Sequence, residues 1–219
     1  MRPTESDLAL QAHTPVDVVP LFGEFVRLER SGHRFLAARD GLWLESNRPW
    51  GRAVWPLAVQ DAVPMPYGAL NQSVELRFGE VPQWCFTRFA QHARKAHPVE
   101  IGAVVTWNEC TGAFTFHLCE SIEARVGHLK ARWPIVGEFE HVVLDIHSHG
   151  PIAAYFSDED KSDMGATMVV ACVLGRMEQE NCEIALSLFA CGLELPSVVP
   201  EKLIAACSKV ICDGCVAEL

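Results

Sequence analysis

Two histidines close a short apolar segment and have the spacing of a metal site. Residues 142–146 are rich in valine, leucine and isoleucine, which is typical of a buried β-strand, and His147 and His149 follow directly. Side chains two residues apart on a strand lie on the same face, about 6–7 Å apart along the backbone. The two imidazoles can therefore converge on one cation, at a Zn–N distance of about 2.0–2.1 Å.

A third candidate ligand follows in the segment S-D-E-D, where Ser157 and Asp160 have the spacing of a helix start. Asp160 would lie in the first turn of that helix, and Asp163, one turn further on, is an alternative ligand. Two histidines and one carboxylate leave a fourth position open, as catalytic zinc requires, whereas structural zinc is usually held by four protein ligands. The pattern therefore predicts a catalytic rather than a structural centre.

The full spacing, H-x-H, seven residues, Ser, two residues, Asp, resembles the signature of the JAMM metallopeptidases, also called the JAB or MPN domain. The resemblance implies that His147, His149 and Asp160 hold one Zn²⁺ per chain and that Ser157 stabilises the tetrahedral intermediate. It also implies a glutamate at the start of an earlier strand, just after a helix, and Glu100 has this position. Glu100 would then be the general base.

Plainer interpretations exist for several of these residues. Ser157 could simply cap the helix, which is worth about 1 kcal/mol, and capping competes for the same oxygen. Glu100 could be an ordinary carboxylate at a strand edge. Asp145, two residues before the first histidine, is expected on the ligand face and could orient an imidazole. Gly150 and Pro151 follow the second histidine, where many family members have proline directly, so we expect a more mobile loop there.

The elements around the motif predict an α+β (α/β) domain, a JAB/MPN-like mixed β-sheet flanked by helices, over residues 76–219. A helix is expected from about Pro82 to Ala96, and a closing helix over 200–211. Residues 121–137 could form a strand or a short helix, and their alternation favours a strand. The other expected strands lie at 99–107, 113–120, 167–174 and 182–189.

Residues 1–75 lie outside this resemblance and are expected to form an N-terminal tail and a β-rich extension. Residues 1–18 are polar and aperiodic, which is typical of a flexible tail. From about residue 23 to 57, short apolar runs alternate with turn signals, which predicts a β-meander. Three tryptophans lie in this region: Trp43, Trp50 and Trp55. They favour a small hydrophobic core over a docking face for a partner.

The net charge of −10 argues against nucleic acid as the main partner, because phosphate binding needs clustered lysine and arginine. The basic pair Arg94–Lys95 is expected to be a solvated helix end. The N-terminus has no signal-peptide core and no apolar run reaches about 18 residues, so we expect no membrane partner and a cytoplasmic location.

The chain has nine cysteines, several of them inside apolar segments, and we interpret these as reduced and buried. The C-terminal C-D-G-C segment, with Cys212 and Cys215, formally matches a redox motif or half a zinc site. Without a second pair at convincing spacing, the sequence does not predict a function for it.

The long N-terminal β region and the segments D-I-H-S-H-G and F-S-D-E-D also resemble the JAMM-domain proteins of the bacterial PRTRC gene system. That resemblance implies a plasmid-borne or mobile operon with a ubiquitin-like protein and an E1/ThiF-type activating enzyme. By analogy, the substrate would be the C-terminal tail of a ubiquitin-like or sulfur-carrier protein, cut at a peptide or isopeptide bond.

Two other functions compete with this interpretation. One is a non-catalytic MPN scaffold in a larger assembly, although such scaffolds usually lack one or more ligands and all five functional residues are present here. The other is a metal-dependent nuclease, which the acidic balance disfavours.

Overall fold

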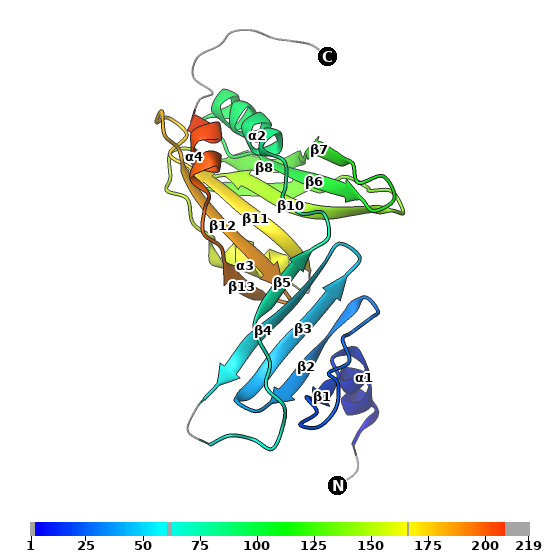
Figure 1. The fold of residues 1–219 in the computed structure, drawn as a ribbon. Coiled ribbons are helices and arrows are strands. Elements are labelled where there is room, and N and C mark those ends of the chain that lie inside the picture. Colours follow the sequence, from blue (N-terminus) through cyan, green and yellow to red (C-terminus); the bar gives the residue numbers. More distant parts are fainter. Residues whose placement is uncertain (1–2, 61–62, 166, 209–219) are drawn as a thin grey trace. The chain divides into compact units, whose positions relative to one another are not determined.

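The computed structural model describes residues 3–60, 63–165 and 167–208. The chain divides into two compact units, Met1–Gly79 and Glu80–Leu219 (Figure 1). Within the described ranges, no helix combines the length and the apolar character that a membrane span needs. The pair Cys212 and Cys215 lies outside the described residues.

The N-terminal unit is built on a five-stranded sheet with the strand order β1-β2-β3-β4-β5. The five strands are β1 (Val16–Val18), β2 (Gly32–Ala38), β3 (Gly41–Arg48), β4 (Gly51–Val59) and β5 (Ser73–Leu76). β1 pairs with β2 in parallel, and every following pair is antiparallel between consecutive strands. The predicted β-meander is therefore confirmed for β2 to β4, and β5 extends the sheet beyond the predicted range.

The expected flexible tail is wrong, because residues Glu5–His13 form helix α1. Thr4 caps this helix: its hydroxyl oxygen accepts the Asp7 N–H at 3.2 Å, and the Asp7 carboxylate accepts the Thr4 N–H at 2.7 Å. This capping box satisfies two backbone donors that would otherwise need water, which stabilises the first turn. Both the helix and β1 lie inside the segment that was expected to be aperiodic.

Apolar side chains fill part of one face of the sheet. The cluster consists of Val19, Leu36, Ala38, Trp43 and Val54, with Phe25 and Leu70 packed against it. Trp43 and Trp50 are only 5% and 4% exposed, so the core interpretation holds for both.

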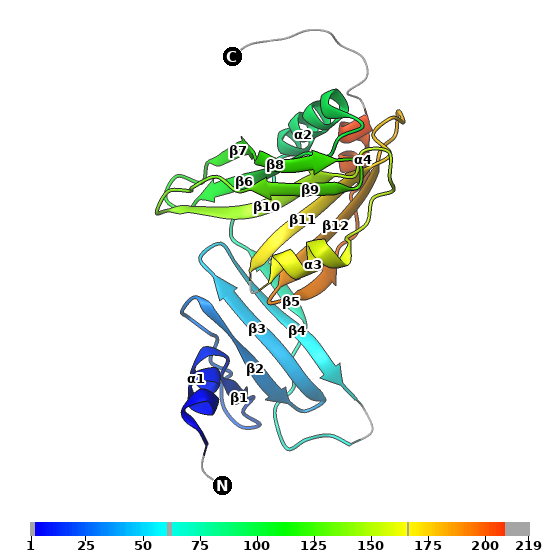
Figure 2. The ribbon, with the colours of Figure 1, turned by 180° about the vertical axis from the view of Figure 1, so that it is seen from behind.

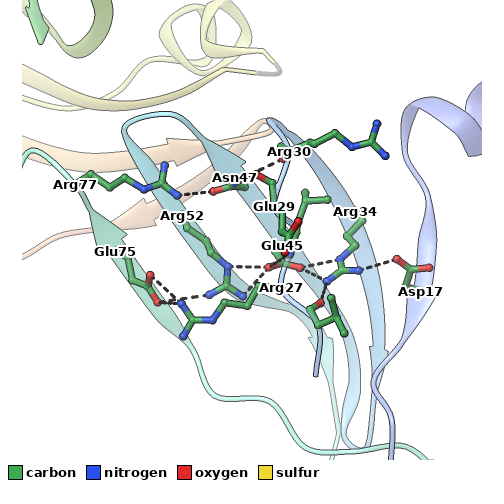
Figure 3. A network of polar contacts seen from close by, with 12 residues as sticks. Asp17, Arg27, Glu29, Arg30, Arg34, Glu45, Asn47, Arg52, Glu75 and Arg77 are labelled. Atoms are coloured by element: carbon green, nitrogen blue, oxygen red, sulfur yellow. Dashed lines mark hydrogen bonds and ion pairs between the residues drawn. The ribbon is translucent and has the colours of Figure 1, made fainter. Parts of the chain in front are cut away.

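Charged side chains cross this sheet in a row to which every strand contributes one residue (Figure 3). In strand order they are Asp17, Arg34, Glu45, Arg52 and Glu75. Glu45 is fully buried; Arg34 Nε donates to its Oε2 and Arg52 Nε to its Oε1, both at 2.7 Å. Arg34 also donates to Asp17 at 2.9 Å, and Arg52 lies 3.6 Å from Glu75. Because the signs alternate, each buried charge has partners of opposite sign. We call this row the charge ladder.

The C-terminal unit is built on a six-stranded sheet with the order β13-β12-β11-β10-β6-β7. Its strands are β6 (Gly102–Asn108), β7 (Phe114–Leu118), β10 (Glu140–Ser148), β11 (Met168–Gly175), β12 (Glu183–Ala190) and β13 (Leu193–Pro196). β10 and β11 are parallel and the other neighbours antiparallel, so the sheet is mixed, as predicted.

Helices α2 (Gln83–Ala96) and α4 (Glu201–Ser208) pack against each other (Figure 1). A separate hairpin, β8 (Glu120–Arg125) and β9 (His128–Arg132), and helix α3 (Asp158–Met164) are best seen in Figure 2. The strand interpretation of residues 121–137 is therefore confirmed for most of that segment. Within residues 3–208, apart from the two gaps, the four helices and the mixed sheets confirm the α+β fold class.

Arg94, near the end of α2, is held by backbone carbonyls rather than solvated as expected, whereas the neighbouring Lys95 is exposed. Arg94 Nη1 donates to the carbonyls of Met177 and Gln179, both at 3.0 Å. Its Nη2 donates to the carbonyls of Glu180 and Cys207, at 3.3 and 3.0 Å. Arg94 thus joins α2 to α4 and to the turn between β11 and β12.

Candidate metal centre

Strand β10 carries the first histidine because its apolar residues are enclosed by the sheet. Leu144 and Ile146 are fully buried, and His147 lies between Val173 of β11 and Gly102 of β6 in the strand register. His149 follows the strand and stays attached to β11, since its N–H donates to the Leu174 carbonyl at 2.8 Å. The pairing on both sides holds the two imidazoles at one end of the sheet.

Helix α3 brings the carboxylate to the histidines. Its last residue, Met164, is buried against Val169, Ala171 and Phe189 of the sheet. Burying a side chain of this size contributes about 1.5–3 kcal/mol. Since Ala171 is the register partner of Asp145 in β10, α3 packs on the sheet face that also carries the first histidine.

The three predicted ligands come together. His147 Nε2 lies 3.1 Å from His149 Nε2 and 3.3 Å from Asp160 Oδ1, and His149 Nε2 lies 3.9 Å from Asp160 Oδ2. Ligand atoms about 2.0–2.2 Å from a tetrahedral zinc ion lie about 3.3–3.6 Å apart. The donor set therefore fits such an ion without rearrangement of the backbone. Asp163, the alternative ligand, lines the same pocket but lies outside this group of three in the described part of the chain.

Ser157 and Asp160 form a reciprocal pair at the start of α3. The Asp160 N–H donates to Ser157 Oγ at 3.1 Å, and Asp160 Oδ2 accepts both the N–H and the hydroxyl of Ser157 at 2.7 Å. This is the capping role that competes with an oxyanion role. It also orients the carboxylate, because Oδ2 is held by Ser157 while Oδ1 faces His147.

The second histidine is fixed through its other nitrogen. His149 Nδ1 lies 3.1 Å from the Ala153 carbonyl oxygen, which can only accept, so Nδ1 carries a proton and a neutral ring presents a lone pair at Nε2. Tyr155 packs edge-on against this ring, with the ring centroids 4.9 Å apart. Burial and the charge of His147 lower the pKa of His149, which favours the neutral form that binds metals.

The pKa of the first histidine, His147, depends on the carboxylates around it. Burial lowers the pKa of His147, but the hydrogen bond to Asp160 and the charges of Asp160, Asp145 and Glu100 raise it above its ordinary value overall. Burial raises the pKa of Asp145 itself to about 6. Asp145 lines the pocket together with His147, in line with its predicted place on the ligand face, and its charge is one cause of the raised pKa of His147.

Glu100 precedes β6 rather than lying within it, because the strand begins at Gly102. Its side chain lines the pocket and is only 4% exposed. Burial raises the pKa of Glu100, although the charge of His147 and a hydrogen bond from the Gly127 backbone act in the opposite direction. A buried carboxyl group of this kind is suited to accept and release a proton.

Ser148, which the sequence reasoning missed, connects Glu100 to the histidines. It is fully buried between the two ligands; its hydroxyl accepts the Ile101 N–H at 3.1 Å, and its own N–H donates to the Ile101 carbonyl at 3.0 Å. The segment that carries Glu100 is thereby attached to the end of β10. In the sequence, the only sign of this role was a small polar residue between the two histidines at the end of a largely apolar strand.

These side chains line a pocket of about 330 Å³. Among the described residues that line it are five carboxylates and three histidines, and none is lysine or arginine. The hairpin contributes His128, Leu129 and Ala131 from β9. A pocket that collects negative charge without an internal counter-charge is suited to a cation.

Comparisons with known families agree with this geometry. Residues 82–187 match the family described as prokaryotic homologs of the JAB domain. This segment is a JAB/MPN-family domain. Residues 4–77 match a domain of unknown function, DUF2016. No curated protein and no solved structure gave a match.

The loop after the second histidine of the JAB domain, where more mobility was expected, is hydrogen-bonded to the turn between β11 and β12. Its residues Gly150 and Ile152 accept backbone hydrogen bonds from Met177 and Arg176, at 2.9 and 2.8 Å. Gly150 has a φ of +53°, and a Cβ there would overlap the carbonyl oxygen of Pro98. Glycine at this position lets the JAB-domain loop pass close to the segment before Glu100.

Proposed function

We propose that the JAB domain is a zinc-dependent JAMM-type peptidase or isopeptidase. The observation that carries the proposal is the meeting of His147, His149 and Asp160, whose ligand atoms all lie within 4.8 Å of one another. A strand end and a helix start supply three ligands, which leaves a fourth position for water or substrate.

Zinc bound by these residues would polarise a substrate carbonyl and bring the pKa of a bound water to about 7. Glu100 would accept the proton of the attacking water at a carboxylate oxygen and return it to the leaving amine. Its burial and raised pKa support this role. Ser157 would donate its hydroxyl to the developing oxyanion at the expense of its bond to Asp160, and one such donor is typically worth about 3–4 kcal/mol.

As substrate we propose the C-terminal tail of a ubiquitin-like or sulfur-carrier protein. β9 pairs with β8 on one side and contributes residues to the pocket, so an extended tail could add as a strand beside it. The PRTRC resemblance adds an E1/ThiF-type enzyme as a proposed partner. Separately, we propose a cytoplasmic location. The alternative is a non-catalytic MPN scaffold that retains the fold.

Metal content tests the centre directly. Wild-type protein is loaded with zinc and freed of excess ion, and its metal content is measured by inductively coupled plasma mass spectrometry. It should carry about one zinc ion per chain. Asp160→Ala should lose the ion, whereas Asp158→Ala, an exposed acidic residue in the same first turn, should keep it. A wild-type protein that takes up no zinc would contradict the enzyme proposal.

Cleavage separates the enzyme from the scaffold. Glu100→Gln should keep zinc but cut a fusion to a ubiquitin-like tail about 10²–10⁴-fold more slowly than wild type, because it removes the base and not a ligand. A zinc-loaded wild type that cuts no such fusion would favour the scaffold, and an unchanged rate in Glu100→Gln would exclude Glu100 as the base.

A further inference from the structure

The turn between β11 and β12 holds the loop that follows the second histidine. The Met177 N–H donates to the Gly150 carbonyl at 2.9 Å, and the Arg176 N–H donates to the Ile152 carbonyl at 2.8 Å. The Arg176 guanidinium also donates to the Pro151 carbonyl at 3.2 Å. None of these β11–β12 residues belongs to the H-x-H or S-D-E-D segments.

Gly175, the last residue of β11, provides the surface on which this loop lies. A Cβ at Gly175 would come within 2.5 Å of both the Ala153 carbonyl carbon and the Ile152 carbonyl oxygen. These are backbone atoms, which cannot move aside as a side chain could. The absence of a side chain at Gly175 therefore allows the close approach of the loop.

Glu183, the first residue of β12, forms a hydrogen bond with the same loop after His149. It is the register partner of Gly175, and its Oε2 accepts the Ala154 N–H at 3.1 Å. Its Oε1 lies 3.7 Å from Arg176 Nε. The carboxylate thus binds the N–H of the same peptide group whose carbonyl belongs to Ala153.

The Ala153 carbonyl is the group that accepts the Nδ1 proton of His149. While this contact holds, the lone pair of a neutral ring is at Nε2, which faces His147 and Asp160. Partners that hold the non-ligating nitrogen of a metal-binding histidine set its tautomer and ring orientation.

We infer that Gly175 and Glu183 are positioning residues for the ligand His149: they hold the Ala153 carbonyl in place and so raise the affinity of the centre for zinc. This inference rests on the proposed metal function. It assigns part of the metal affinity to a turn outside the ligand motif.

The test compares Glu183→Ala with Glu180→Ala, an exposed glutamate in the same turn. Zinc affinity, measured by competition with a chelator at constant pH, should fall about tenfold in Glu183→Ala, within the range known for such outer partners, and stay unchanged in Glu180→Ala. Glu183→Gln keeps an oxygen that can accept the Ala154 N–H and should bind zinc within about threefold of wild type. Equal affinity in wild type and Glu183→Ala would overturn the inference.

A readout in the metal-free protein separates this inference from the proposed function. The ¹⁵N shifts of the His149 ring report which nitrogen carries the proton: wild type should show Nδ1–H, and Glu183→Ala and Gly175→Ala should show a mixture of tautomers. If wild type takes up no zinc, the peptidase proposal fails. If the tautomer is the same in wild type and both variants, the positioning role fails.

Discussion

Each of the two units buries carboxylate groups, but the charged side chains around these carboxylates differ between the units. In the N-terminal unit, Glu45 lies between Arg34 and Arg52, so both of its carboxylate oxygens face a guanidinium group. In the C-terminal unit, the described residues that line the pocket bring together carboxylates and histidines with no lysine or arginine. A buried carboxylate with a guanidinium group on each side has no charge left to attract a cation, whereas a cluster of carboxylates without such partners can bind one. Counter-charge, more than burial, therefore separates a structural network from a candidate site.

The largest expected effect concerns the centre of the charge ladder. Glu45→Ala leaves two largely buried guanidinium groups without their shared partner and should cost about 3–5 kcal/mol in the free energy of unfolding of the N-terminal unit. Hydrogen exchange over residues 32–59 measures this loss within the unit.

Two results would break the comparison of the units. Glu24→Ala, an exposed glutamate of the same unit, should leave exchange over residues 32–59 unchanged. The zinc content of Glu45→Ala should equal that of wild type. A lower zinc content, or exchange as slow as in wild type, would show that Glu45 is not a purely structural charge.

A smaller effect concerns the pH dependence of the metal-free protein. Burial raises the pKa of Asp160, but hydrogen bonds from His147 and Ser157 outweigh this and bring it to about 2. Because the pKa is lower in the folded than in the unfolded chain, near 3.9, the stabilisation is present above about pH 4 and is lost as the pH falls through about 2. It amounts to about 2 kcal/mol.

Urea unfolding of the metal-free wild type and of Asp160→Asn measures the stabilisation that ionised Asp160 provides. The difference in unfolding free energy between the two should shrink by about 2 kcal/mol from pH 5 to pH 2. Asp158→Asn, exposed in the same turn, should follow wild type at both pH values. A difference that does not depend on pH would mean that Asp160 is not held as an ionised partner.

The smallest expected effect concerns the cap of α3. Ser157→Ala removes the side-chain acceptor for the Asp160 N–H and should lower the unfolding free energy of the metal-free protein by about 1 kcal/mol. Ser162→Ala, at an exposed position of the same helix, is the control. An unchanged stability in Ser157→Ala would show that the capping box does not hold the helix start, which would leave the hydroxyl free for substrate.

The candidate ligands could be predicted because their spacing encodes local geometry. Two histidines at i and i+2 on a strand must share a face, and S-x-x-D before a helix must place the carboxylate in the first turn. The same signal, Thr4 to Asp7, begins α1, and it was overlooked because the surrounding residues are polar. Composition was a weaker guide there than the capping pattern.

The charge ladder could not be predicted, because its pairs depend on strand register. Nothing local in the sequence shows that Glu45 lies opposite Arg34 or that Arg52 reaches it diagonally from the next strand. Arg94 was misjudged for a similar reason: its four carbonyl acceptors come from segments distant in the chain. Long-range pairing of this kind is decided only when the tertiary fold forms.

Asp160 uses one carboxylate oxygen to cap helix α3 and directs the other toward the histidines, so the binding of a cation is linked to the formation of this helix. Helix α3 has seven residues, too few to persist alone in water, where the first turn is the costly step of helix nucleation. One carboxylate oxygen helps to close that first turn, and the other is directed toward the histidines. A cation drawn to the second oxygen would leave the first in place, so binding and nucleation would reinforce one another as a single cooperative event.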